Sequence, residues 1–302
     1  MHYLIKNDLK FLFAGVLCSL LCCCATSSQH SYDFTKEFEF TTGIEGPAVD
    51  KEGSLFAVNF KEEGTIGKVN KDGEGVVYAT LPKGSIGNGI RFDYEGHMYI
   101  ADYAGHKIYQ IKKNTRVPVV WAQDSLMNQP NDLAISPSGV VYLSDPDWKN
   151  NTGNIWMIGA DRIPVRLEQN MGTTNGIEVS PNGKQLYVNE SVQRTIWQYD
   201  IQPNGRLKNK TLLTSFKDYG LDGMRCDVKG NLYITRYDKG TVVILSPGGT
   251  VLEEIKLQGK KPSNITFGGV DGKSCFVTMA DRGCIEAFTS LYSGNYYSKI
   301  HK

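Results

Sequence analysis

The feature that most constrains the fold is a sequence pattern that occurs six times along the chain. Each copy has a polar residue, a small residue, alternating apolar positions, a turn and an apolar and aromatic run, as in 222–237 (DGMRCDVKGNLYITRY). The copies begin at Glu45, Asn88, Asn131, Asn175, Asp222 and Ser263. Successive copies start 41 to 47 residues apart, and no long stretch has the 3.6-residue period of a helix. Short strands repeated at this spacing are typical of propeller blades. The sequence therefore predicts an all-β fold, a six-bladed β-propeller.

The repeats account for most of the 302 residues, so we expect a single propeller domain over residues 34–302. The polar segment 25–33 before it is expected to be a flexible tether. One terminus usually completes the last blade, because a free strand edge invites aggregation. The alternating segment 34–40 (FTKEFEF) is expected to be that strand, and the aromatic C-terminal segment 291–300 (LYSGNYYSKI) is the alternative.

The first 24 residues differ from the repeats. Two lysines precede an apolar run over 11–21, which is shorter than the roughly 20 residues that a membrane span needs. Three cysteines end this run: Cys22, Cys23 and Cys24. We interpret residues 1–24 as an export signal of the lipoprotein kind, in which one of these cysteines carries lipid. Cleavage near Ala25 without lipid, and an uncleaved anchor, are the alternatives. An exported protein, periplasmic or on the cell surface and held on a bacterial membrane by lipid, is expected.

Without residues 1–24 the chain has 31 basic and 31 acidic residues and is formally neutral. No basic stripe is left, which argues against nucleic acid as a partner. We expect a monomer that acts on a small molecule.

Nucleophilic catalysis has few candidates outside the signal segment. Cys226 occupies an apolar strand position and is interpreted as a small buried hydrophobic residue. Cys275 and Cys284 lie on neighbouring strands of the last blade in poor register, so that a disulfide is possible but not favoured. Only His106 could approach the face on which the repeats begin, and a Ser-His-Asp arrangement has no suitable geometry.

Repeat symmetry places the first residue of each copy at equal height around the propeller axis. All six of these side chains, which we call the ring residues, carry an oxygen atom: Glu45, Asn88, Asn131, Asn175, Asp222 and Ser263. Two carboxylates with neutral amide oxygens suit Ca²⁺, whereas Zn²⁺ would favour His or Cys. A water-filled polar tunnel is the alternative. A longer insert in blade three, 145–154, puts Trp148 on the same face, where it is either a specificity loop or a plain surface loop.

Five stretches together resemble the senescence-marker-protein/gluconolactonase family, which includes regucalcin, and more distantly diisopropyl-fluorophosphatase and the paraoxonases. They are IEGPAVD, QPNDLAISPSG, TNGIEVSPNGKQLYVNES, LDGMRCDVKGNLYITRY and KKPSNITFGG. The resemblance implies a divalent metal, usually calcium, on the axis, with Glu45, Asn175 and Asp222 as ligands. It implies Asn131 as a further ligand or a substrate contact. Animal relatives have an arginine two residues before this position, where this chain has Gln129. The resemblance therefore implies a lactonase, but it supports gluconolactone as the substrate less strongly.

Three functions follow from these observations. The first is a metal-dependent hydrolase that opens lactones of sugar acids, with Ca²⁺ and with Mg²⁺, Mn²⁺ or Zn²⁺ as other possible cations. Asp222 is its candidate general base, Asn131 and Asn88 would orient the ester oxygens, and Gln129 and Trp148 would contact substrate. The second is a phosphotriesterase-like reaction on the same ring. The third is a non-catalytic binding propeller tethered to a membrane.

Overall fold

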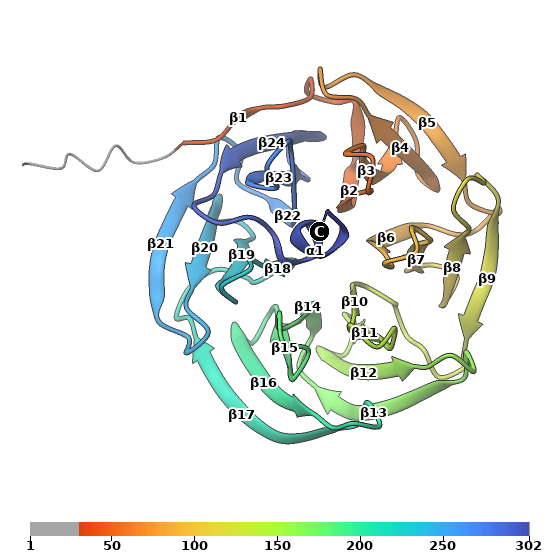
Figure 1. The fold of residues 1–302 in the computed structure, drawn as a ribbon, viewed down its shortest axis with the longest axis vertical. Coiled ribbons are helices and arrows are strands. Elements are labelled where there is room, and N and C mark those ends of the chain that lie inside the picture. Colours follow the sequence, from red (N-terminus) through yellow and green to blue (C-terminus); the bar gives the residue numbers. More distant parts are fainter. Residues whose placement is uncertain (1–29, 302) are drawn as a thin grey trace, which may run out of the picture.

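The computed structural model describes residues 30–301, and their strands form six antiparallel sheets of four strands each. The sheets are arranged like blades around a central axis (Figure 1). The predicted six-bladed β-propeller is confirmed. Cys22, Cys23 and Cys24 lie outside the described residues.

Each blade runs from an inner strand at the axis to an outer strand at the rim (Figure 1). Blades one to three contain β2 (Phe40–Val49), β3 (Leu55–Phe60), β4 (Thr65–Val69), β5 (Gly75–Thr80), β6 (Gly87–Phe92), β7 (Met98–Asp102), β8 (Lys107–Ile111), β9 (Pro118–Gln123), β10 (Leu133–Ile135), β11 (Val141–Asp147), β12 (Thr152–Ile158) and β13 (Pro164–Met171). Blades four to six contain β14 (Thr174–Val179), β15 (Gln185–Glu190), β16 (Thr195–Ile201), β17 (Leu207–Ser215), β18 (Met224–Cys226), β19 (Leu232–Arg236), β20 (Thr241–Leu245), β21 (Val251–Lys256), β22 (Pro262–Gly268), β23 (Ser274–Met279), β24 (Cys284–Thr289) and, from the N-terminus, β1 (Tyr32–Asp33).

The last blade is closed from the N-terminus, two residues earlier than predicted. β1 pairs antiparallel with β24, and the backbone N–H of Phe34 continues this edge with a 2.9 Å hydrogen bond to Ile285 O. Arg282 holds the closure with ion pairs of 2.6 Å to Asp33 and 2.7 Å to Glu37. The expected tether over 25–33 is therefore wrong for its last residues, because they are paired in the sheet.

The C-terminal segment is helical and does not supply the closing strand. Helix α1 (Asn295–Ile300) lies at one end of the axis (Figure 1). Its Tyr296 hydroxyl donates a 3.0 Å hydrogen bond to Asp93 O, and that of Tyr297 donates one of 2.6 Å to Val270 O. Over residues 30–301, no helix has the length and apolar character needed to cross a membrane.

The hydrophobic core is divided into six clusters, one between each pair of neighbouring blades. Between blades one and two, for example, Phe56 and Ile66 pack against Ile90 and Ile100. The period-two pattern of the strands produces this arrangement, because side chains of each twisted sheet face a neighbouring blade on both sides. Cys226, Cys275 and Cys284 are buried in these clusters as free thiols.

The small residue after a ring residue lets neighbouring inner strands approach closely. The backbone N–H of Gly89 donates to Asn131 O, and that of Gly223 donates to Ser263 O, both at 2.8 Å. A Cβ atom at Gly223 would lie 2.1 Å from the side chain of Asn264 in the next blade. These interblade hydrogen bonds hold the ring residues at one level around the axis.

Candidate active site

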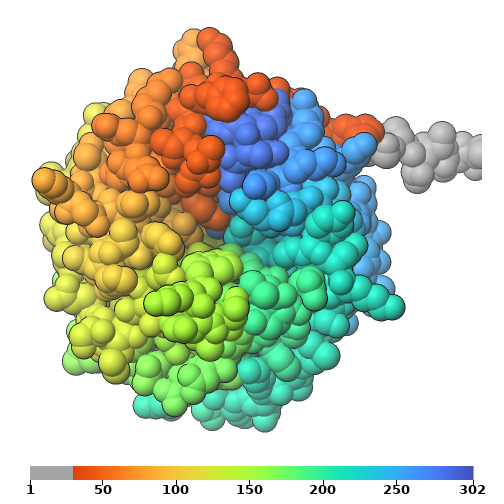
Figure 2. Space-filling model, turned by 180° about the vertical axis from the view of Figure 1, so that it is seen from behind, coloured from red at the N-terminus to blue at the C-terminus, as the bar shows by residue number. Residues whose placement is uncertain are grey.

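A cavity of about 560 Å³ opens at the centre of the face opposite α1. Figure 2 shows this face, where segments from all six blades surround a central hollow. All six ring residues line the cavity, and so does Trp148. The walls further out are formed in part by three tyrosines: Tyr103, Tyr219 and Tyr237.

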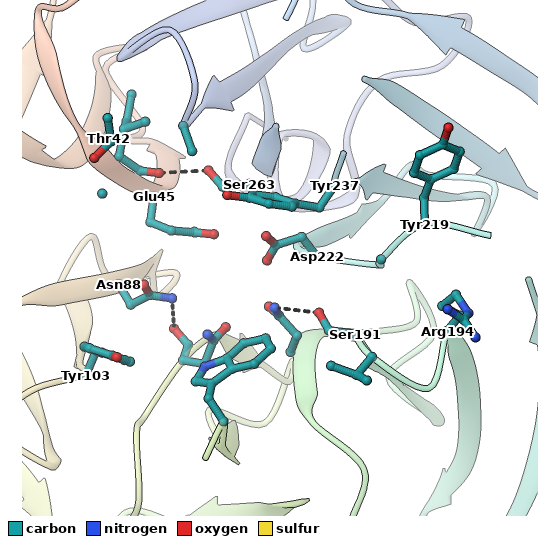
Figure 3. Close-up of a pocket in the computed structure, with 18 residues that line it drawn as sticks. Thr42, Glu45, Asn88, Tyr103, Ser191, Arg194, Tyr219, Asp222, Tyr237 and Ser263 are labelled. Atoms are coloured by element: carbon teal, nitrogen blue, oxygen red, sulfur yellow. Dashed lines mark hydrogen bonds between the residues drawn. The ribbon is translucent and has the colours of Figure 1, made fainter. Parts of the chain in front are cut away.

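The carboxylates of Glu45 and Asp222 point toward each other across the base of the cavity (Figure 3). Burial, followed by the charge of Asp132, raises the pKa of Glu45 to about 7. Burial, followed by the charge of Glu45, raises the pKa of Asp222 well above its usual range. Two acids about 180 residues apart in the sequence thus face each other in a buried place, where ionisation is disfavoured unless a positive charge lies nearby.

Asn131 and Asn175 each have a buried amide oxygen without a partner. Within residues 30–301, neither Oδ1 atom accepts a hydrogen bond. The orientation of Asn175 is set by its Nδ2, which donates a 3.1 Å hydrogen bond to Ser191 Oγ. Buried polar atoms are rarely left unpaired, and such an oxygen needs an explanation such as a bound ion.

The side chains of the other two ring residues, Ser263 and Asn88, form hydrogen bonds within the protein. Ser263 Oγ donates a 2.8 Å hydrogen bond to Ile44 O and shares another of 2.8 Å with Thr278 Oγ1. Asn88 donates through Nδ2 to Asn131 O at 3.2 Å (Figure 3). Ser263 thus ties the last blade to the first, while Asn88 faces the cavity beside Asn131.

The structure separates the two predicted substrate contacts of blade three. Trp148 lies in the connection between β11 and β12 and lines the cavity. Gln129 is not among the residues that line it. Its Oε1 accepts a 3.2 Å hydrogen bond from the backbone N–H of Trp148, and its own N–H donates to Asp145 Oδ1 at 2.7 Å. Gln129 therefore supports the loop that carries Trp148, and its contact with a substrate stays a prediction.

Below the ring, the axis is filled by a charged layer that the sequence analysis missed. Asp132 is fully buried and contacts Arg91 at 2.9 Å and Arg225 at 3.3 Å. Asn264 donates from Nδ2 to Glu45 Oε2 at 2.9 Å, which links this layer to the ring. The signal was present in the repeats, because both arginines occupy the variable position three residues after a ring residue.

Carboxyl groups outnumber guanidinium groups around the axis. A fourth acid, Glu178, lies in the same region as Glu45, Asp132 and Asp222. Burial raises the pKa of Glu178 to about 7. These four carboxyl groups outnumber the two guanidinium groups of the charged layer, those of Arg91 and Arg225. No His or Cys is among the residues that line the cavity. Two carboxylates and two unpaired amide oxygens fit a hard cation such as Ca²⁺ better than Zn²⁺.

Comparison with known proteins identifies the family. The model of the "SMP-30/Gluconolactonase/LRE-like region" matches residues 40–281, which is most of the chain. The chain belongs to the SMP-30/gluconolactonase family. The matched range includes all six ring residues and every other residue that lines the cavity.

Individual relatives match different shares of the chain. It is 30% identical to a gluconolactonase of Zymomonas mobilis over 218 residues, 64% of this chain and 60% of that protein. It is 25% identical to the diisopropyl-fluorophosphatase of Loligo vulgaris, over 84% of this chain and 91% of that protein. The calcium-binding protein regucalcin of Agrobacterium tumefaciens has the same fold, with a TM-score of 0.76 at 19% identity, over 88% of this chain and 96% of that one.

Proposed function

We propose that the protein is a lactonase that requires a divalent cation, calcium by preference, and opens lactones of sugar acids. The observation that carries this proposal is the facing pair Glu45 and Asp222, flanked by the unpaired oxygens of Asn131 and Asn175, at the base of an open cavity. The similarity to the Zymomonas gluconolactonase supports the reaction class.

Four residues would hold the cation: Glu45, Asn131, Asn175 and Asp222. Their donor atoms are oxygens, and the two carboxylates match the charge of the ion. A bound divalent cation supplies Lewis-acid polarisation of a carbonyl group. A bound cation would also favour the ionised forms of both carboxyl groups, whose pKa values are raised first by burial and then by neighbouring carboxylates.

Asp222 is our candidate for the general base. It is partly exposed to the cavity, whereas Glu45 is 8% exposed and its Oε2 already accepts two hydrogen bonds, from Gly46 N–H and Asn264. A carboxylate that also binds metal is a weaker base, so Asp222 would serve to orient an attacking water as well as to accept its proton. Asn88 and Asn131 would orient the ester oxygens of the substrate.

Tyr237 supplies a proton donor on the same wall, beside Asp222 and Ser263 (Figure 3). Burial, followed by the charge of Asp222, raises the pKa of its hydroxyl to about 12, so that it stays protonated at neutral pH. A phenol at this place can donate a hydrogen bond to an oxygen that gains negative charge. Trp148 and Tyr103 provide aromatic surface against which the apolar face of a sugar ring can pack.

The test is hydrolysis of a panel of small lactones by metal-stripped protein, before and after addition of Ca²⁺, Mg²⁺, Mn²⁺ or Zn²⁺. We expect turnover of sugar lactones that chelation abolishes and Ca²⁺ restores. Full activity in the stripped protein would contradict the metal requirement. Binding of a lactone without turnover would favour the non-catalytic binding propeller.

A phosphotriesterase-like activity is the second candidate. The observation that favours it is the similarity to diisopropyl-fluorophosphatase over 91% of the length of that enzyme. The cation and the amide groups of Asn131 and Asn88 would then bind a phosphoryl oxygen in place of a lactone carbonyl. Diisopropyl fluorophosphate should be assayed beside the lactones, with fluoride release as the readout. A larger kcat/KM for this substrate would reverse the order of the two proposals.

We also propose that the protein is exported and lipid-anchored through Cys22, Cys23 or Cys24. The sequence of residues 1–24 supports this, and the first described strand, β1, lies at the rim of the propeller, away from the cavity (Figure 1). Attachment upstream of β1 leaves the cavity open to substrate. Mass spectrometry of the purified protein should find a lipidated cysteine at the mature N-terminus, and an intact Met1 or an unmodified Thr26 would contradict the anchor.

A further inference from the structure

One cationic side chain stands on the wall of the cavity. Arg194 lies in the turn between β15 and β16, together with Ser191 and Val192, which also line the cavity. Two hydrogen bonds of Ser191 fix this turn to the site: its Oγ accepts from Asn175 and donates to Leu221 O. The turn is thus tied to one of the four proposed cation ligands.

The guanidinium of Arg194 has no carboxylate partner in the part of the chain that the structure describes. Arg91, Arg225, Arg236 and Arg282 each form an ion pair of 3.3 Å or less. Arg194 forms none, and its Nε is buried without a hydrogen-bond partner. A guanidinium carries five donors in a planar fork that matches an oxyanion.

The charges of the cavity are separated in space. Glu45 and Asp222 lie at the axis, while Arg194 lies to one side beyond Ser191, near Tyr219 (Figure 3). Among the residues that line the cavity, Arg194 is the one cation. A molecule that extends from the axis to the Ser191 side of the cavity would therefore have one end at the carboxylates and the other beside an unpaired positive charge.

We propose that Arg194 binds a carboxylate carried by the substrate, so that the preferred substrates are lactones of sugar diacids. This inference rests on the proposed lactonase function and adds the substrate class. The carboxylate would accept hydrogen bonds from the fork of Arg194, and the exposed ring of Tyr219 would border it on the outer side. Selectivity then arises from the charge on the wall, and the ring residues bind the group common to all lactones.

The test compares D-glucaro-1,4-lactone with D-glucono-1,4-lactone, which share a ring and differ only in a carboxylate or a hydroxymethyl group at C6. With calcium present, wild-type protein should have the higher kcat/KM for the glucarolactone. In Arg194→Met the ratio of the two kcat/KM values should fall roughly 10- to 100-fold, mainly through KM, as expected for loss of a hydrogen bond between charged groups. Arg194→Lys should recover part of the ratio, because it keeps the charge but not the fork.

Arg162→Met is the matched control. Arg162 also occupies an exposed turn with a positive φ angle, 62° against 56° for Arg194, but it does not line the cavity. The Arg162→Met substitution should leave the ratio of the two kcat/KM values unchanged. An unchanged ratio in Arg194→Met, or a wild-type preference for the gluconolactone, would overturn the inference. If wild-type protein opens neither lactone, the proposed function fails, and calorimetric binding of the two intact lactones to wild type and Arg194→Met then decides the role of Arg194 by itself.

Discussion

Removing the proposed cation should make the stability of the protein depend on pH, because Glu45 then has to ionise while it is buried and close to the charge of Asp132. The ordinary pKa of this carboxyl is 4.5, and its pKa in the folded metal-free protein is about 7. A raised pKa means that the folded state holds the proton more tightly than the unfolded state does. The stabilisation is fully present below pH 4.5 and is lost as the pH rises through about 7. At about 1.4 kcal/mol per pKa unit, the loss from Glu45 amounts to about 3 kcal/mol.

Calcium should abolish this loss. With the ion between them both carboxylates can stay ionised, and a concentration 100 times the Kd adds about 2.7 kcal/mol to the free energy of unfolding. The calcium-dependent rise in Tm should therefore be larger at pH 8 than at pH 5, where protons compete with the ion for the same oxygens.

Urea unfolding of metal-stripped protein between pH 4.5 and pH 8 measures the effect. Glu45→Gln should lose about 3 kcal/mol less than wild type over this range, since the titrating group is gone. Glu63→Gln, at an exposed position outside the cavity, is the matched control and should behave as wild type. Equal pH dependence in wild type and Glu45→Gln, or equal stabilisation of both by calcium, would refute the reasoning.

Three further substitutions test separate parts of the site. Asp222→Asn keeps an oxygen but removes the charge, and we expect calcium affinity and turnover to fall at least tenfold while circular dichroism shows a folded propeller; full lactonase activity would contradict its role. Asn88→Ala should raise KM for a lactone with little change in the calcium Kd measured by calorimetry, and a large loss of calcium affinity would make Asn88 a ligand. Asp132→Asn removes the buried carboxylate with which Arg91 and Arg225 both form an ion pair, which should lower the free energy of unfolding by about 3 to 5 kcal/mol. A change below 1 kcal/mol in urea unfolding would show that this buried pairing contributes little.

Much of the architecture could be predicted because a blade is a local unit. Each copy of the pattern carries its own turn and its own alternation of apolar residues, which suffice to form two paired strands. Six such copies have to close into a ring, and closure places Glu45 and Asp222 at the same height although blade six lies between their blades. The face on which Trp148 lies followed from the same reasoning, because it comes at the end of a second strand.

The N-terminal closure was less accessible to sequence reasoning. The segment 34–40 alternates like a strand, but the pairing with β24 occurs at Tyr32–Asp33. There Arg282 forms ion pairs with Asp33 and Glu37. The position of an edge strand depends on such ion pairs with a distant blade, and a local pattern does not contain them. The C-terminal segment likewise became a helix through contacts of Tyr296 and Tyr297 with two other blades.

By itself the sequence determined how many blades form and which six residues face the axis, since both depend on a short repeated pattern of side-chain polarity. The tertiary structure decided what each of those side chains is free to do. Ser263 donates a hydrogen bond to Ile44 O, 219 residues away, while the Oδ1 atoms of Asn131 and Asn175 have no hydrogen-bond partner among residues 30–301. Asp132 accepts a hydrogen bond from Arg225, which lies 93 residues later in the sequence. The availability of a polar group depends on every neighbour that could pair with it, and in a closed ring those neighbours come from blades that are far apart in the chain.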